Sequence, residues 1–168
     1  MTRDAELESF VETIAQEYPD RNQIIFVCIG SDRSTGDAYG PIVGSMLKER
    51  GWPNIIGTLE QPCDAHAVEG AANAALNAAG SDHAIIIAVD ACLGHPKSVG
   101  GYITSKGPLQ PGQAIGRRLP PIGHFSIAGV VNMNGVKAYA MLQTTSLHHV
   151  MQMARRTVEA VERAWRRQ

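Results

Sequence analysis

Apolar positions along the chain follow two spacings, one typical of buried strands and one typical of amphipathic helices. Continuous apolar runs rich in β-branched residues occupy positions 24–30 and 84–89, and strands buried on both faces have this composition. Shorter apolar runs predict further strands over 55–59, 102–105 and 126–131. Apolar residues three or four positions apart predict helices over 4–18, 36–50, 66–79 and 146–165, and another that begins at Asn134.

The alternation of these strands and helices predicts an α/β fold. We expect a three-layer α/β/α sandwich with a mostly parallel sheet. With no internal repeat and no interior linker, residues 1–168 form a single domain. Ligands in such folds bind beyond the carboxyl ends of the strands. Residues 106–123 hold four of the nine prolines and predict a long irregular loop, which in a compact domain is usually functional.

Composition and charge exclude several classes of protein. A net charge of −1 gives no basic surface for nucleic acid. The longest apolar run, AIIIAV, is too short to cross a membrane. Three widely spaced cysteines without a CxxC motif indicate free thiols in a reducing cytosol, so we expect a cytoplasmic protein. The amphipathic first helix could pack against a second copy and form a homo-oligomer.

Acidic residues follow both buried strands, where the chemistry of such a fold is expected. Asp32 and Asp37 come after the first strand, and Asp90 comes directly after the second. If the two strands are neighbours, Asp37 and Asp90 share one crevice. Two close carboxyl groups do not both ionise readily, so one keeps a proton and the pair can activate water and protonate a leaving group. The same pair could instead bind a divalent metal ion.

Each of these residues also has a structural interpretation. Asp37 at the start of a helix could be a cap, and Asp32 in a polar loop could be a turn residue. Asp90 follows six apolar residues, and a buried carboxyl group needs partners or a raised pKa. His124, between the long loop and the last strand, could reach the crevice. The loop GSDRSTGDAYG matches neither glycine-rich phosphate-binding motif.

Five segments of the chain resemble the YyaC-type family of spore proteases. They are FVCIGSDRSTGDAYGPIVG, AVDACLG, GPLQPG, LPPIG and GVVN, and they span most of residues 24–150. That family resembles the germination protease of spores and hydrogenase maturation endopeptidases, which implies a sandwich of the phosphorylase/hydrolase-like type. The resemblance also implies a peptidase of sporulation or germination that acts on a protein or peptide substrate.

The resemblance assigns roles to particular residues. The stretch Thr35-Gly36-Asp37-Ala38-Tyr39-Gly40-Pro41 matches T-P-D-A-L-G-P of the germination protease, and Val89-Asp90-Ala91 matches its I-D-A segment, so Asp37 and Asp90 are the expected catalytic residues. Hydrogenase maturation endopeptidases complete a nickel site with a histidine that would fall near Val131 or Asn132, where this chain has none. We therefore expect no resident metal. The expected substrate-binding residues are Asp32, Ser34, Thr35, His124 and Asn132.

Two other functions are compatible with the same residues. A catalytically silent relative would keep the fold and bind a protein or peptide partner, because fold does not determine function. A metal-dependent hydrolase would use Asp37, Asp90 and His124. In the peptidase, the 106–123 loop would grip an extended substrate.

Overall fold

The central sheet of the computed structural model, which describes residues 3–64, 66–78, 83–109 and 121–168, has the strand order β2-β1-β3-β5-β4. Every neighbouring pair is parallel except β4 with β5, so the prediction of an α/β fold with a mostly parallel sheet is confirmed. The strands are β1 Ile24–Cys28, β2 Ile55–Ile56, β3 Ile85–Gly94, β4 Tyr102–Ser105 and β5 Phe125–Met133.

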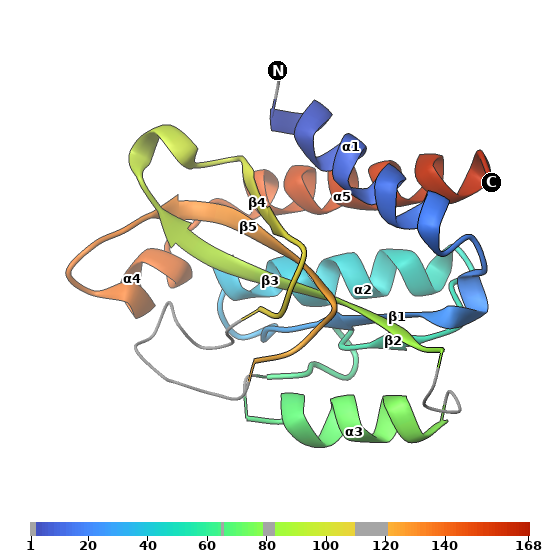
Figure 1. Ribbon diagram of the computed structural model, residues 1–168. Helices are drawn as coiled ribbons and strands as arrows, with labels where there is room; N and C mark the ends of the chain where they lie inside the picture. The colour runs from blue at the N-terminus through green and yellow to red at the C-terminus, as the bar shows by residue number, and fades with distance from the viewer. Residues whose placement is uncertain (1–2, 65, 79–82, 110–120) are drawn as a thin grey trace.

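Helices cover both faces of the sheet and make the three layers (Figure 1). Helices α1 (Arg3–Glu17), α2 (Tyr39–Glu49) and α5 (Leu147–Arg166) lie on one face, and α3 (Val68–Ala78) lies on the other. Side chains of β1 alternate between the two sides, because successive residues of a strand point to opposite faces. Phe26 and Cys28 pack on the α1, α2 and α5 side, whereas Val27 and Ile29 pack on the α3 side.

Several element boundaries differ from those predicted. Strand β3 continues past Asp90 to Gly94, because its pairing with β5 continues beyond an irregularity between Cys92 and Leu93. The predicted helix over 36–50 begins with a 3₁₀ turn, η2 (Gly36–Ala38), before α2. Helix α4 (Ala138–Gln143) begins four residues later than expected.

The ends of the 106–123 loop pair with each other. Leu109 and Ile122 are buried and form an antiparallel bridge, with N–H···O distances of 2.7 and 2.9 Å. The middle of the loop, residues 110–120, lies outside the described residues, and so does its predicted grip on a substrate.

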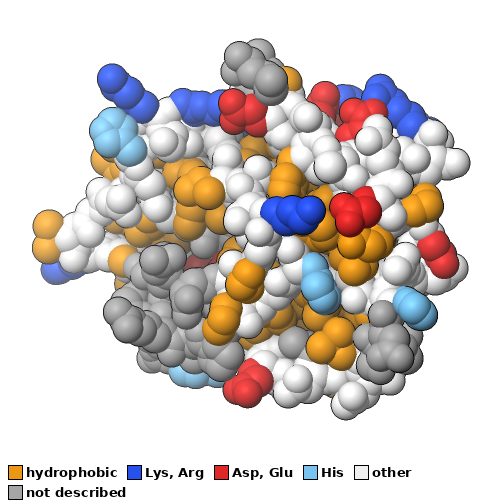
Figure 2. Space-filling view, in the orientation of Figure 1, with side chains coloured by type: hydrophobic (Ala, Val, Ile, Leu, Met, Phe, Trp, Pro, Cys, Tyr) orange, Lys and Arg blue, Asp and Glu red, His pale blue; other side chains and the backbone are white. Residues whose placement is uncertain are grey.

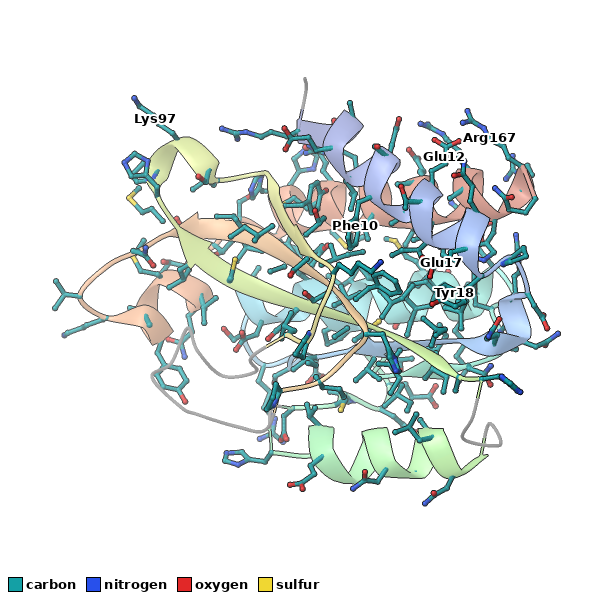
Figure 3. All side chains as sticks on the ribbon, viewed as in Figure 1. Phe10, Glu12, Glu17, Tyr18, Lys97 and Arg167 are labelled. Carbon is teal, nitrogen blue, oxygen red and sulfur yellow. The ribbon has the colours of Figure 1, made fainter. Side chains whose placement is uncertain are left out.

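Helices α1 and α5 pack against each other through an apolar seam bordered by ion pairs. Leu7, Val11 and Ile14 of α1 are buried within the chain's own core, so this apolar face does not need a second copy to cover it. Arginines of α5 pair with acidic residues of α1 along the charged upper edge of Figure 2. One such pair, Arg167 with Glu12 at 3.1 Å, is labelled in Figure 3. Among the described helices, none has the length and apolar character of a membrane span.

The start of α2 packs backbone to backbone against the carboxyl end of β1. A Cβ atom at Gly40 would overlap the carbonyl oxygen of Ile29, and one at Gly44 would overlap that of Gly57. Gly30 has a φ of +151°, and a Cβ there would overlap the carbonyl oxygen of Asp37. This contact therefore requires glycine, and it brings η2 over the edge of the sheet.

We expect Gly40→Ala to lower the free energy of unfolding by about 2–3 kcal/mol, because an added methyl group must push the helix away from β1. Urea denaturation measures the change. Gly70→Ala is the matched control, since Gly70 lies in α3 with nothing within 4 Å of the added atom. There the better helix propensity of alanine should raise stability by about 0.5–1 kcal/mol. Equal stability of the two variants would show that the contact is not tight.

Candidate active site

Asp37 and Asp90 lie at the same edge of the sheet, at the carboxyl ends of two adjacent strands. Strands β1 and β3 are parallel neighbours, with Cys28 opposite Val89, and Asp90 follows that pair. The turn η2, which carries Asp37, packs against β3. Both aspartates are partly buried. The condition on which the predicted pair depends, that the two strands are neighbours, is therefore met.

Burial raises the pKa of both carboxyl groups, and repulsion by Asp37 adds to the effect on Asp90. Burial raises the pKa of Asp90 well above its ordinary value, and the negative charge of Asp37 raises it further. A hydrogen bond from the backbone N–H of Ala91, at 2.8 Å, partly offsets these effects on Asp90. Burial also raises the pKa of Asp37. The two groups thus interact electrostatically, as a proton-sharing pair requires.

The side chain of Asp37 does not cap a helix. Thr35 holds the N-cap position of η2 and Ala38 that of α2, and neither cap has a side-chain hydrogen bond. Within the described part of the chain, the carboxyl group of Asp37 has no hydrogen bond and no ion pair. The capping interpretation therefore fails, and a partly buried carboxyl group is left without a structural partner.

The loop that leads to Asp37 is held by its backbone. The N–H of Gly30 donates to the carbonyl of Cys63 at 2.9 Å, and the N–H of Ser31 donates to the carbonyl of Asp37 at 3.2 Å. The hydroxyl of Ser31 stabilises the turn by accepting from the N–H of Arg33 at 3.1 Å. Asp32 and Arg33 are exposed, and no ion pair joins them in the described structure. Asp32 is thus available to a ligand at the surface.

His124 lies at the wrong edge of the sheet for the predicted site. Its N–H donates to the carbonyl of Ile86 at 2.8 Å, and its Nδ1 accepts from the N–H of Ile86 at 3.0 Å. Ile86 is near the amino end of β3, four residues before Asp90, or about 13 Å along the strand. The expectation that His124 reaches the crevice is therefore wrong, because a residue just before a parallel strand lies at its amino end.

Asn132 lies at the correct edge but uses its amide inside the fold. Its Nδ2 donates to the carbonyl of Met141 at 3.0 Å and to the hydroxyl of Thr145 at 3.2 Å, and its Oδ1 accepts from the N–H of Met133 at 2.8 Å. These bonds fix the end of α4, whose Leu142 packs against Gly36 of η2. Asn132 therefore supports the turn that carries Asp37, and its contact with substrate stays a prediction.

Two thiols lie beside Asp90, and sequence reasoning assigned neither to the site, because it interpreted Cys92 as a structural cysteine. Cys63 lies next to β1 through a bridge with Ile29, and Cys92 follows Asp90 on the same strand. Burial raises the pKa of Cys63 to about 11, and the charges of Asp64 and Asp90 contribute. Burial and the charge of Asp90 raise the pKa of Cys92 to about 11. No local pattern marks Cys63, because only the folded chain brings it to this edge.

The donor set at this edge does not fit a nickel ion. Within the described residues, no group of three or more histidine, cysteine, aspartate or glutamate side chains could hold a metal. His124 is at the other end of the strands, and the amide of Asn132 is already hydrogen bonded. The metal-dependent hydrolase that would combine Asp37, Asp90 and His124 is therefore excluded by the position of the histidine.

Comparison with sequence families identifies a relationship over almost the whole chain. Residues 1–160 match the model of a family described as "Protein of unknown function (DUF1256)". The chain belongs to this family. It is also 43% identical over 133 residues to "Uncharacterized protein YyaC" of Bacillus subtilis (strain 168), and the match covers 78% of this chain. The chain spans 64% of the length of that relative.

Two solved structures share the fold. The chain superposes on the NiFe hydrogenase maturation protease HycI of Thermococcus kodakarensis KOD1 with a TM-score of 0.59 and 18% identity, over 86% of this chain and 93% of that one. The maturation protease HybD of Thermococcus kodakarensis gives a TM-score of 0.51 and 14% identity, over 84% and 97% of the two chains. At these identities the likeness establishes the architecture.

We expect Asp90→Asn to stabilise the fold at neutral pH but not at low pH. The pKa of Asp90 is higher in the folded than in the unfolded chain. When the pH rises above the ordinary pKa of an aspartate, the unfolded chain releases this proton first, and the free energy of unfolding falls. Asparagine has no such proton to release and can still accept from the N–H of Ala91. Urea denaturation from pH 3 to pH 8 should show a difference near zero at the lowest pH that grows as the pH rises.

Asp32→Asn is the control for this series, since Asp32 is exposed. Its effect on stability should change little with pH. A constant difference between wild type and Asp90→Asn across the whole series would argue against a buried, repelled carboxyl group at position 90.

Proposed function

We propose that this protein is a peptidase that uses Asp37 and Asp90 as a proton-sharing pair. The main support is the carboxyl group of Asp37, which is partly buried, has no partner in the described structure, and repels that of Asp90. An aspartate with a purely structural role is usually capped or ion-paired, because even partial burial of a carboxyl group without a partner is unfavourable. Residues that lower the stability of the fold in this way are typical of functional sites.

The environments of the two aspartates suggest different roles. Asp90 is subject to burial and to the charge of Asp37, so it is the partner that keeps the shared proton. Ionised Asp37 would take a proton from a water molecule that attacks the peptide carbonyl carbon. Asp90 would then give its proton to the amide nitrogen as the carbon–nitrogen bond breaks, which leaves one carboxylic acid and one amine.

A protein or peptide substrate suits the surface near this edge. Met133 at the end of β5, Val136 in the segment that follows, and Tyr139 of α4 are exposed apolar residues, and α4 packs against the turn η2. Exposed apolar side chains of this kind often contact other proteins. The setting in sporulation or germination is part of the proposal and rests on the resemblance of the sequence.

The same apolar residues favour a second candidate, a catalytically silent protein that binds a peptide partner. Such a protein would need the surface around α4 but not the protonation of Asp37 and Asp90. The two functions therefore differ in their response to isosteric replacement of the aspartates.

The test is cleavage of a diverse library of synthetic peptides, followed by mass spectrometry from pH 4 to pH 8. We expect wild type to cleave a subset, and Asp37→Asn or Asp90→Asn to slow cleavage by about 100-fold or more. The rate should fall as the pH rises through the raised pKa of Asp90, because the acid is then lost. EDTA should not change the rate.

Asp64→Asn is the control, because the side chain of Asp64 accepts backbone hydrogen bonds from His66 and Ala67 at 3.0 Å and asparagine can do the same. It should cleave like wild type. If peptides bind wild type and the double aspartate variant equally and neither protein cleaves them, the peptide-binding function is favoured over the peptidase. Cleavage that survives both aspartate substitutions would refute the paired site.

A further inference from the structure

The hydroxyl of Ser34 is a buried polar group without a partner, close in sequence to Asp37. Its Oγ is shielded from solvent and makes no hydrogen bond in the described structure. Buried hydroxyl groups nearly always have a partner, and leaving one unpaired destabilises a fold. An exception beside a proposed active site therefore requires an explanation.

Ser34 lies directly before Thr35, the N-cap of η2, and its side chain does not cap the turn. Its carbonyl accepts the N–H of Ala38 at 3.0 Å, so residues 34–38 form one helical turn. The sequence Ser34-x-x-Asp37 resembles a capping box, in which each side chain bonds to the other residue's backbone N–H. Neither bond exists here, and both side chains are left without partners.

The spacing of Ser34 and Asp37 puts the two residues on one face of the turn, although no hydrogen bond joins their side chains in this structure. Side chains three residues apart in a helical turn lie on the same face, and in a 3₁₀ turn they are almost eclipsed. Thr35, two residues before Asp37, points elsewhere by the same rule. A serine hydroxyl rotates about one torsion and can donate one hydrogen bond, which an ionised carboxylate can accept.

We propose that Ser34 is a positioning residue that donates a hydrogen bond to the ionised carboxylate of Asp37 and so makes Asp37 the base of the pair. This proposal rests on the proposed function for its catalytic meaning, although the hydrogen bond itself does not. One bond satisfies both unpaired groups. It favours the charged form of Asp37, whereas in the described part of the chain the carboxyl group of Asp90 accepts the N–H of Ala91 and has no side-chain donor.

Other titratable groups on the elements around η2 do not replace Ser34 in this role. Strand β3 brings Asp90 and Cys92, which would repel the charge on Asp37 or stay neutral. Helix α4 brings the exposed Tyr139, and α5 brings His149, which lies against Gly100. Tyr39 of α2 is hydrogen bonded to Thr157 at 2.9 Å.

The test is the pKa of Asp37, measured by carbon-13 NMR of the carboxyl group in wild type, Ser34→Ala and Ser34→Thr. We expect Ser34→Ala to raise this pKa by about one unit, because a hydrogen bond to the charged form is lost. Ser34→Thr keeps the hydroxyl and should restore the wild-type value. In the peptide assay, Ser34→Ala should lower kcat about tenfold and move the acidic limb of the pH profile upward.

Ser31→Ala is the matched control, because this serine is in the same loop but its hydroxyl already accepts the N–H of Arg33. It should leave the pKa of Asp37 and kcat unchanged. An unchanged pKa in Ser34→Ala would overturn the role of Ser34, even if Asp37→Asn abolishes cleavage. If Ser34→Ala raises the pKa of Asp37 but the wild-type protein cleaves no peptide, the hydrogen bond is supported and the peptidase function is rejected. A covalent acyl adduct on Ser34 would instead make it the nucleophile and overturn positioning.

Discussion

The contact between two backbones, at the start of α2 and the carboxyl end of β1, is the constraint on which the rest of the site depends. It is possible because Gly40 has no side chain to separate the helix from Ile29, while Gly44 and Gly57 allow α2 to approach the residue after β2 and that residue to approach β1. Because α2 lies so close to the sheet, the turn η2 crosses the edge of the sheet and packs against β3. The position of Asp37 over the edge of the sheet therefore depends on glycines that let the two backbones approach.

Much of this architecture could be predicted from sequence, because strands buried on both faces have a composition that does not depend on their partners. The prediction ended β3 at Asp90 because a charged residue interrupts its apolar run, whereas pairing with β5 carries the strand on to Gly94. The predicted start of α4 was wrong because Val136 has helical spacing but is fully exposed, so it does not belong to the buried face of a helix. Patterns of apolar residues reveal burial, and they fail where an apolar residue faces solvent.

The site was predictable where chain order decides which edge a residue occupies. Asp37 and Asp90 follow their strands and lie at the carboxyl edge, while His124 precedes β5 and lies at the amino edge. Asn132 shows a different limit, since its position was correct but its hydrogen bonds to α4 depend on a helix that packs only in the fold. Cys63 shows a third, because a short bridge to Ile29 brings it in from a stretch without periodic signal.

The thiols beside Asp90, those of Cys63 and Cys92, are expected to have low reactivity. With a pKa of about 11 for Cys63 and Cys92, only about one thiol in 10⁴ is ionised at neutral pH, and the thiolate is the form that peroxides and alkylating agents attack. The same low polarity that holds protons on the carboxyl groups holds them on the sulfurs. We therefore expect these two thiols to react with oxidants more slowly than an exposed, acidic cysteine would.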